Sequence, residues 1–346
     1  MKTIDMRSDT VSHPTPAMWE AMSNAAVGDD VYGDDPTVNK LEAETATMFG
    51  MEDALFVSSG TQGNLIALLT HCERGSEIIC GNKSHIFLNE TGGMSALGGI
   101  MPHILPVQSD GTLDLDHIKA AIRGNDPHYP RTRLVAIENT QNAAGGKAIG
   151  AAYTQSVAAL AKENGLIFHI DGARIFNAAA ACSEPVKNLV TGADSVSVCL
   201  SKGLCAPVGS MLVGGKAFIA EARRTRKMVG GGMRQAGILA AAGLIALHEM
   251  STRLHEDHAH AMLLAEGLSE IPGLTVNSQS TSFVYLQLNA DAPLSPAEFK
   301  AALRERDIII SSYPGVEDKF RLVTHYWITE ERVHQVIDTM RELLTT

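Results

Sequence analysis

The sequence predicts an α/β protein in which a large domain with a mainly parallel sheet is followed by a smaller α+β domain. From residue 50 to about residue 215, short apolar runs rich in strand-forming residues alternate with helical patterns. After Gly232 the pattern changes to a long Ala-rich helical stretch, and mixed strand and helix signals follow. A chain of 346 residues is long enough for one large domain and one smaller domain.

The expected strands of the large domain are near-continuous apolar segments, which is typical of parallel strands buried on both faces. They are Ala54–Val57, Glu77–Cys80, Leu134–Glu138, Leu166–Ile170, Ser195–Leu200 and Ser210–Val213. Helices are expected at Thr61–His71, Leu115–Ile122 and Tyr153–Glu163, each with a polar start signal and a glycine or polar turn near its end.

The C-terminal part predicts a connector and a compact second domain. A helix is expected from Met233 to about Met250, continuing through the His-rich stretch His255–His260 into another helical segment. The elements expected beyond it are the strands Phe283–Leu288, Ile308–Ser311 and Arg321–His325 and the helices Pro296–Arg304 and Glu330–Leu344. We place the domain boundary near residue 245, so that the large domain with its N-terminal arm covers 1–245 and the small domain covers 246–346.

Composition excludes several classes of protein. Hydrophobic residues make up 45% and charged residues 19% of the chain, which excludes bulk disorder. The net charge is −11 and the longest basic run is the short Arg223–Lys227, so we expect no nucleic-acid-binding surface. Five cysteines without a Cys-x-x-Cys pair favour a reducing cytoplasm over a disulfide framework or zinc ribbon. No signal-peptide pattern opens the chain, and its most apolar stretch, Gly237–Leu247, is too short to cross a bilayer, so we expect a soluble, cytoplasmic protein without membrane contact.

A histidine cluster in the connector is the one candidate metal site. His255, His258 and His260 have helical spacing and flank two acidic residues. A solvated helix face explains this pattern better than metal ligation, and we expect no metal.

One polar turn lies where a predicted strand ends and a helix begins. The segment Ser58–Asn64 offers hydroxyls and free backbone N–H groups, and the helix dipole favours phosphate there. It is neither a dinucleotide-binding G-x-G-x-x-G nor a Walker A loop. Taken alone, it is more simply a glycine-containing turn.

Two further segments place charged groups at strand ends. Asp171 and Arg174 follow a predicted central strand, where ligands bind in α/β sheets, although a salt bridge would also explain them. Lys202 follows another apolar strand, and a lysine with its amine held near neutral can form a Schiff base, although an exposed lysine is the simpler interpretation. The phosphate-type turn, the aspartate and the Ser-Lys pair follow one another in this order along the chain. This order favours the functional interpretation of all three over the simpler ones.

Together these signals resemble a pyridoxal phosphate enzyme of the aspartate aminotransferase-like fold, known as fold type I. The match becomes specific along most of the chain, which resembles the low-specificity type of the L-threonine aldolase family from Ile4 to the C-terminal helix. The motifs that carry it are Arg7–Thr10, Val27–Pro36, Ser59–Thr61, His169–Asn177, Ser201–Leu204 and Gly230–Gly237.

The resemblance implies pyridoxal 5'-phosphate as cofactor and assigns residues to it. Lys202 would hold the cofactor aldehyde, and Asp171 would keep the pyridine nitrogen protonated so that the ring acts as an electron sink. The other residues implied at the cofactor are Ser59, Gly60 and Thr61 at the phosphate, His85 stacked on the ring, Arg174, and Arg234 reaching the phosphate of a neighbouring subunit.

The resemblance also implies a substrate site and an assembly. Ser8, Arg174 and Arg321 would bind the substrate carboxylate, for which guanidinium groups are well suited. His128 matches a second active-site histidine, and Lys227 matches a basic residue near a neighbouring site. The chain would form a homo-oligomer, a tetramer built as a dimer of dimers.

The implied activity is reversible cleavage of L-threonine, L-allo-threonine and related β-hydroxy-α-amino acids to glycine and an aldehyde, in threonine catabolism and glycine formation. His85, His128 or an ordered water are the candidates for the base that removes the β-hydroxyl proton. The alternatives are another reaction on this scaffold, such as β-elimination, transamination or racemisation, and a silent cofactor-binding protein. Lys202, Asp171 and the two candidate carboxylate-binding arginines, Arg174 and Arg321, are all present. Their presence argues against a silent protein, which would not need this set of groups.

Three positions depart from the family pattern. Cys205 stands where glycine is usual, which predicts backbone strain or altered lysine positioning if the site needs a positive φ. Gln141 stands where histidine is common, and Ser282 where asparagine is common. None lies in the cofactor motifs.

Overall fold

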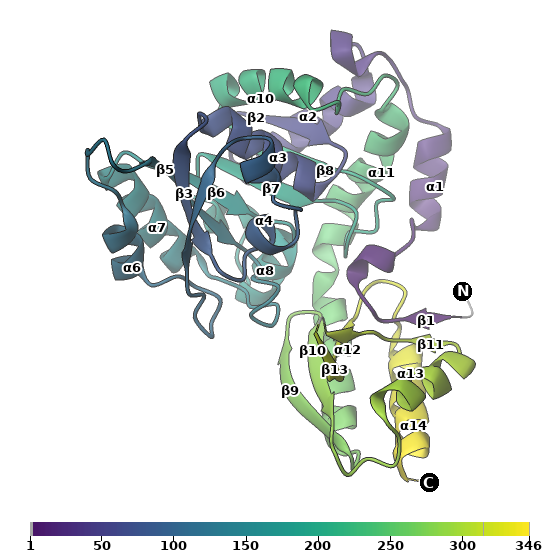
Figure 1. Ribbon diagram of the computed structural model, residues 1–346. Coiled ribbons are helices and arrows are strands. Elements are labelled where there is room, and N and C mark those ends of the chain that lie inside the picture. Colours follow the sequence, from purple (N-terminus) through teal and green to yellow (C-terminus); the bar gives the residue numbers. More distant parts are fainter. Residues whose placement is uncertain (1–2, 314, 346) are drawn as a thin grey trace. The chain divides into compact units, whose positions relative to one another are not determined.

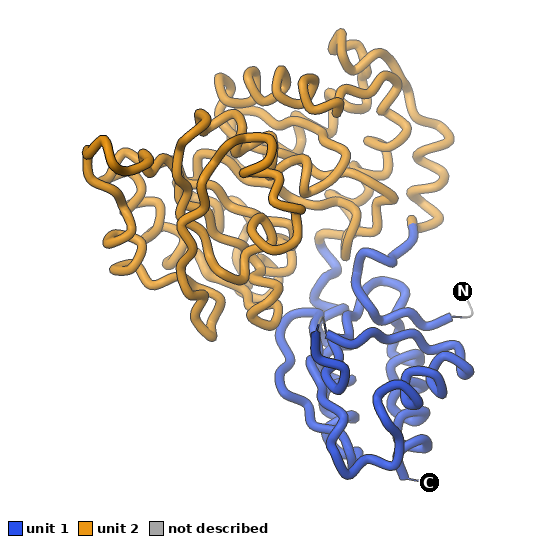
Figure 2. The backbone as a smooth tube through the Cα atoms, in the orientation of Figure 1, with its two compact units in different colours: residues 1–13, 252–346 blue, residues 14–251 orange. Residues whose placement is uncertain are grey.

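The computed structural model describes residues 3–313 and 315–345 of the chain. Its contacts divide the chain into two compact units, coloured separately in Figure 2: unit 1 comprises residues 1–13 and 252–346, and unit 2 comprises residues 14–251. The N-terminal segment, which the sequence placed with the large domain, belongs to unit 1 because β1 (Ile4–Asp5) pairs in parallel with β11 (Ile308–Ile309). The sequence-based division at residue 245 falls inside helix α11 (Gly237–His248), before the break between the units.

Unit 2 is built on a seven-stranded sheet with the order β2-β8-β7-β6-β5-β3-β4. Its strands are β2 (Asp53–Val57), β3 (Ser76–Gly81), β4 (Met101–Leu105), β5 (Arg131–Glu138), β6 (Ile167–Asp171), β7 (Ser195–Cys199) and β8 (Ser210–Gly214). The run from β7 to β4 is parallel, whereas β8 is antiparallel to both of its neighbours. The predicted α/β class with a mainly parallel sheet is confirmed, and all six strands expected there are present.

Helices alternate with these strands, as Figure 1 shows. They are α1 (Pro16–Ser23), α2 (Pro36–Phe49), α3 (Gly60–His71), α4 (His85–Leu88), α5 (Gly93–Ala96), α6 (Leu115–Ala121), α7 (Ala151–Glu163), α8 (Ile175–Cys182), α9 (Val186–Leu189), α10 (Lys216–Met228) and α11, with short 3-10 turns η2 (Asp30–Tyr32) and η3 (Met250–Thr252). Among the described residues, no helix is both long enough and apolar enough to span a membrane.

One buried carboxylate explains why α11 begins at Gly237 and not at the expected Met233. Asp35 caps α2 by accepting from the N–H groups of Thr37 and Val38, and it also accepts from the N–H of Gly237 at 2.8 Å. A side chain at Gly237 would place its Cβ 2.5 Å from an Asp35 oxygen, so only glycine fits. Asp35 therefore ties the motif Val27–Pro36 to the start of α11. The helix ends at His248 instead of running to Met250.

Unit 1 holds an antiparallel sheet with the order β12-β13-β10-β9 and helices packed around its own apolar core. Its further elements are η1 (Asp9–Val11), α12 (Leu254–Ser269), β9 (Leu274–Ser280), β10 (Phe283–Leu288), α13 (Pro296–Glu305), β12 (Ser312–Tyr313), β13 (Val316–Val323) and α14 (Glu330–Thr345). Of the expected strand Ile308–Ser311, only Ile308–Ile309 form a strand, β11, and β12 begins one residue after the expected end. The expected strand Arg321–His325 begins earlier, at Val316, because β13 pairs along most of β10.

Candidate active site

Six strands of unit 2 end at the same edge of the sheet. All of its described strands except β8 run in one direction, because β8 is antiparallel to both β2 and β7 and the other pairs are parallel. At or just beyond their carboxyl ends lie Ser59, His85, Glu138, Asp171 and Lys202. This is the edge where α/β sheets bind ligands. We call it the carboxyl edge; it collects Ser59, His85, Asp171 and Lys202, which the sequence singled out on separate segments, together with Glu138.

The turn after β2 forms a cradle for an anion. Ser59 caps α3, and its Oγ accepts from the N–H of Gln62, so the N–H groups of Gly60 and Thr61 remain at the first turn without intrahelical acceptors. A Cβ at Gly60 would lie 2.7 Å from the sulfur of Cys199, and glycine is therefore required there. The buried Ser210 hydroxyl has no hydrogen-bond partner and lies 3.8 Å from that same position. These features fit a phosphate group.

Asp171 closes β6 as a buried carboxylate with 2% of its surface exposed. Its Oδ1 accepts from the N–H of Ala173 at 3.1 Å, and its Oδ2 accepts from the amide nitrogen of Asn64 at 2.9 Å. A carboxylate has about four acceptor positions, so these two bonds leave room for a further donor such as a pyridinium N–H. The environment of Asp171 fits the predicted cofactor.

Lys202 lies in a tight turn beyond β7. Its carbonyl accepts from the N–H of Cys205 at 2.8 Å, and Cys205 is buried with a φ of 63°. This is the left-handed region, so the condition under which the sequence predicted strain at Cys205 is met.

Glu138 is a buried residue, 5% exposed, whose carboxylate lies at the end of β5. Its Oε2 accepts from the N–H of His85 at 2.7 Å, and its Oε1 accepts from the N–H of Asn142 at 2.9 Å. Burial, with the nearby charge of Asp171, raises the pKa of Glu138 to about 7. Glu138 was not predicted as a site residue. The signal that could have identified it is a carboxylate at the end of an apolar strand.

Gln141, one of the three departures, packs into this group. Its Nε2 donates to the carbonyl of Lys83 at 2.9 Å and to Glu138 at 3.3 Å, and its Oε1 accepts from the N–H of Ala144. Glutamine therefore satisfies its buried amide in full and connects the loop before His85 to β5. Ser282, another departure, is buried in unit 1, where its carbonyl accepts from Thr324.

His85 contacts a second carboxylate that the sequence analysis missed. The Nδ1 of His85 lies 2.8 Å from Glu90, which is 8% exposed, and the same Glu90 oxygen accepts from Asn64 at 2.9 Å. The hydrogen bond to Glu90 raises the pKa of His85, while burial acts in the opposite direction. His85, Glu90 and Asp171 each place one potential ligand atom within 4.8 Å of the others, and the hydrogen bonds through Asn64 account for this proximity.

His128 lies at the opposite edge of the same sheet. It stands three residues before β5 begins at Arg131, whereas Glu138 ends that strand at the carboxyl edge. Its side chain is 85% exposed, and its Nδ1 contacts Asp126 at 2.7 Å. Because β5 has eight residues, a distance on the order of 25 Å separates the two edges within one chain.

The remaining basic residues of unit 2 have different environments. Arg174 is buried at the start of α8, close in sequence to Asp171. Arg234 is exposed and pairs with Asp29 at 2.8 Å. In the basic run on α10, Arg226 is buried and bound to Asp30 at 2.7 Å, which is a structural role, while Lys227 packs beside Gly232.

Ser8 and Arg321 lie together within unit 1. The Ser8 hydroxyl accepts from the N–H of Thr10 as the cap of η1. Arg321, on β13, donates from Nη2 to the carbonyl of Arg7 at 3.3 Å and stacks over the ring of Phe283 at 5.4 Å. The structure thus joins two of the predicted carboxylate-binding residues from the two ends of the chain.

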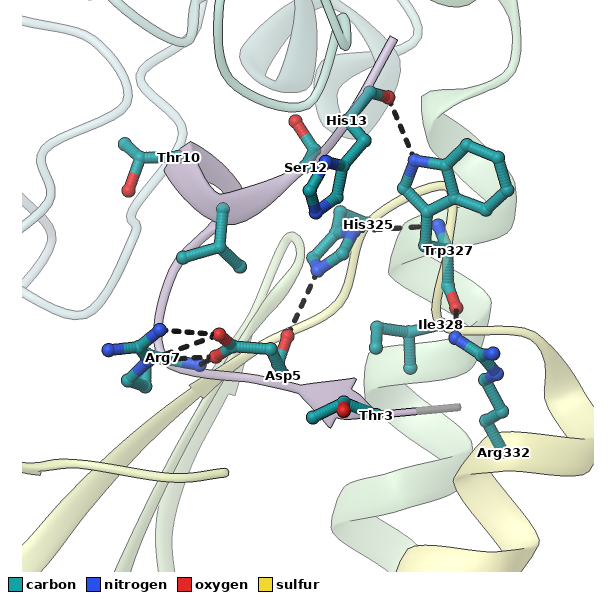
Figure 3. Close-up of a pocket in the computed structure, with 11 residues that line it drawn as sticks. Thr3, Asp5, Arg7, Thr10, Ser12, His13, His325, Trp327, Ile328 and Arg332 are labelled. Atoms are coloured by element: carbon teal, nitrogen blue, oxygen red, sulfur yellow. Dashed lines mark hydrogen bonds and ion pairs between the residues drawn. The ribbon is translucent and has the colours of Figure 1, made fainter. Parts of the chain in front are cut away.

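A separate cavity of about 520 Å³ lies in unit 1 beside this segment. Figure 3 shows His325 between the carbonyl of Asp5 and the N–H of Trp327, with Arg332 beside Trp327. Arg332 donates to the carbonyl of Trp327 at 2.8 Å. The cavity is lined by none of the predicted site residues.

Comparisons with known proteins agree with this arrangement. The family model for beta-eliminating lyases matches residues 5–291. The chain is 47% identical to low-specificity L-threonine aldolase 1 of Arabidopsis thaliana, with 100% of this chain and 98% of the relative covered. It is 45% identical to the low specificity L-threonine aldolase of Escherichia coli strain K12, with 99% of each covered.

Solved structures show the same fold at lower identity. The threonine aldolase of Leishmania major has a TM-score of 0.83 at 22% identity, covering 99% of both chains. A putative L-allo-threonine aldolase of Listeria monocytogenes has a TM-score of 0.81 at 20% identity, covering 99% of this chain and 97% of that one.

Proposed function

Because the chain belongs to the beta-eliminating lyase family and, within it, to the low-specificity L-threonine aldolases, we propose that it is an aldehyde-lyase acting on L-threonine, L-allo-threonine and related β-hydroxy-α-amino acids. It cleaves the Cα–Cβ bond reversibly, giving glycine and an aldehyde. The observation that carries the proposal is the convergence of Ser59, Asp171 and Lys202 at one sheet edge.

Pyridoxal 5'-phosphate is the cofactor, and it supplies an electron sink for the pair released as the Cα–Cβ bond breaks. The Asp171 carboxylate would hold a proton at the pyridine nitrogen. The Lys202 amine would hold the cofactor by its aldehyde, and the N–H groups of Gly60 and Thr61 with the Ser59 hydroxyl would hold the phosphate. His85 would stack on the ring, and Arg174 would lie at the cofactor.

The substrate is held by its carboxylate and loses a proton from its β-hydroxyl. Ser8, Arg174 and Arg321 bind the carboxylate, because planar guanidinium groups donate two parallel hydrogen bonds to it. A base removes the hydroxyl proton, and the candidates are His85, His128 and an ordered water.

We further propose that the active unit is a homo-oligomer, a tetramer built as a dimer of dimers. His128 is too far from the carboxyl edge of its own chain to act there, so it would act in the site of another copy, as would Arg234. Tyr32 and Met228 are 77% and 72% exposed, and their elements, η2 and α10, are joined by the ion pair between Asp30 and Arg226 at 2.7 Å. The backbone N–H of Asp30 also donates to the carbonyl of Arg234. The exposed apolar side chains of Tyr32 and Met228 in this region support a subunit interface beside Arg234.

The proposed setting is the cytoplasm, in threonine breakdown and glycine formation. All five cysteines are free and four of them are buried, which supports a reducing compartment.

Product analysis tests the function. Purified holoprotein should convert L-threonine to glycine and acetaldehyde, and glycine with acetaldehyde should give the reverse reaction. The name of the family model favours β-elimination as the second candidate, which would instead release ammonia and a 2-oxo acid from threonine or serine. Formation of the 2-oxo acid without glycine would replace the aldolase proposal with the elimination.

A further inference from the structure

A hydrogen-bonded chain runs from the candidate active site into the sheet, and the proposed reaction does not use most of it. In order, it contains His85, Glu90, Asn64, His169, Ser195 and His71, with Asp171 bound at Asn64. No sequence motif assigns a role to Glu90, Asn64, Ser195 or His71. The central side chains are buried, with Asn64 1% exposed and His169 and Ser195 fully enclosed.

The orientation of Asn64 follows from its neighbours. Glu90 and Asp171 are both 2.9 Å from the same side-chain atom of Asn64, and two carboxylates require a donor there. That atom is therefore the NH₂ group, with one hydrogen for each carboxylate. The amide oxygen then faces the Nε2 of His169 at 3.2 Å and needs a donor from it.

The rest of the chain has one consistent arrangement of protons. Burial lowers the pKa of His169 to about 4 and that of His71 to about 3, so both rings are neutral near pH 7. With its proton on Nε2, His169 accepts at Nδ1 from the Ser195 hydroxyl at 2.8 Å. Ser195 in turn accepts from the Nε2 of His71 at 2.9 Å, whose ring stacks on Phe218. Each polar atom in the chain thus has one defined role.

The same reasoning fixes the tautomer of His85. Its Nδ1 donates to Glu90, so in the neutral ring the Nε2 carries the free lone pair. The charged or titratable groups that face His85 are Glu90, Asp171, Glu138 and Lys202. Glu90 is the one that contacts the ring nitrogen.

From these contacts we propose that Asn64 and Glu90 are positioning residues: Asn64 holds the carboxylates of Asp171 and Glu90 in fixed orientations, and Glu90 fixes the tautomer of His85. This rests on the proposed function, in which Asp171 and His85 contact the cofactor. An amide does not exchange protons as an imidazole or hydroxyl does, so the chain orients groups and does not conduct protons through Asn64. The buried His169, Ser195 and His71 act on Asp171 only by fixing the amide.

The first test measures histidine tautomers directly in the unchanged holoprotein. With ¹⁵N-labelled histidine, NMR should show the proton of neutral His85 on Nδ1 and those of His169 and His71 on Nε2. A His85 ring protonated on Nε2 alone would overturn the proposal. Substituting Glu90→Gln should lower the pKa of His85, because the anionic acceptor is lost; an unchanged His85 pKa would overturn the role of Glu90.

The second test measures cofactor affinity. Asn64→Ala should weaken pyridoxal 5'-phosphate binding about 10- to 100-fold, because Asp171 loses a charge-assisted hydrogen bond that orients it. The control Asn164→Ala removes an exposed amide at the end of α7 and should leave affinity unchanged. Wild-type affinity in Asn64→Ala would refute its role. If Asn64→Ala does not fold, the tautomers of the unchanged protein still decide.

Neither test uses threonine turnover. A protein with the expected tautomers but no aldolase product would contradict the proposed function and leave the positioning inference standing. The reverse result, with full turnover and different tautomers, would overturn this inference alone.

Discussion

The two edges of the sheet in unit 2 hold their titratable side chains in very different ways. At the carboxyl edge, Asp171, Glu138 and Glu90 are each at most 8% exposed and receive at least two hydrogen bonds from their own chain. At the amino edge, His128 is 85% exposed and contacts Asp126, which is itself 50% exposed. The first set is positioned by this chain, whereas His128 is presented outward, in keeping with a role in another copy.

The amino-edge loop is nevertheless anchored at its base. Arg123 donates to the buried Glu77, and its backbone N–H donates to Thr132 at 3.0 Å. The guanidinium of Arg123 also lies over the ring of Tyr129, 5.3 Å from its centroid. These contacts hold the residues on both sides of His128 while leaving its imidazole accessible.

Lys202→Ala should have the largest effect, because it removes the covalent attachment at the carboxyl edge. We expect the turnover of threonine to fall by at least about 10³-fold. Borohydride reduction of the native protein should attach a pyridoxyl group to the peptide that contains Lys202. A label on Lys227 instead would contradict the contrast between the two edges, because the cofactor would then be attached away from the carboxyl edge. Lys162→Ala, an exposed change on α7, is the matched control.

Arg321→Leu tests whether unit 1 contributes to the same reaction. The loss in kcat/KM for threonine should be on the order of 2–5 kcal/mol, and the rise in KM should account for much of it, because the arginine binds the substrate carboxylate. The absorption band of the bound cofactor should stay unchanged. Ordinary threonine kinetics, or loss of the cofactor band, would give Arg321 a different role.

His128→Ala tests the contrast between the edges most directly. We expect a loss of about 100-fold, typical of a proton-transfer or positioning group. Mixing this variant with Lys202→Ala, after dissociation and reassociation, should restore about a quarter of native activity if His128 acts in a partner's site, since half of the dimers would each hold one intact site. No recovery in verified mixed oligomers would show that His128 and Lys202 act within the same chain.

Sequence reasoning worked where signals were local and failed where they depended on packing. Apolar runs located all six strands expected in the large domain, but the edge strand β4 was missed because Pro102 and His103 interrupt its apolar pattern. Asp171 and Lys202 stood out because each follows an apolar strand. Asn64 and Glu90 did not, because their importance lies in contacts between α3, β6 and the loop after α4, which no local pattern records.

The role of His128 illustrates the same limit at a larger scale. A motif match placed it with Lys202 in one site, and no spacing in the sequence indicates that the two lie at opposite edges of a sheet. The direction of β5 supplies that information. The sheet topology thus shows that His128 and Lys202, which the resemblance assigned to one site, lie at opposite edges of the sheet within one chain.

The smallest expected effect concerns strain at the carboxyl edge. Cys205 has a φ of 63°, where a side chain costs about 1–2 kcal/mol and glycine costs little. In ordinary buried positions alanine is more stable than glycine by roughly 0.5–1 kcal/mol. At position 205 we expect the reverse. In denaturant unfolding, the free energy of unfolding of Cys205→Gly should exceed that of Cys205→Ala by about 1 kcal/mol, because both variants lose the sulfur but only alanine keeps the strain.

The same two substitutions at Cys80, a buried residue near the end of β3, provide the control, and there alanine should be the more stable. Threonine turnover in Cys205→Gly should stay within a few-fold of native, because the bond from the Cys205 N–H to the Lys202 carbonyl is made by the backbone and survives the substitution. Should alanine be the more stable residue at both positions, the turn that holds Lys202 would carry no strain. The departure at Cys205 would then be a neutral replacement.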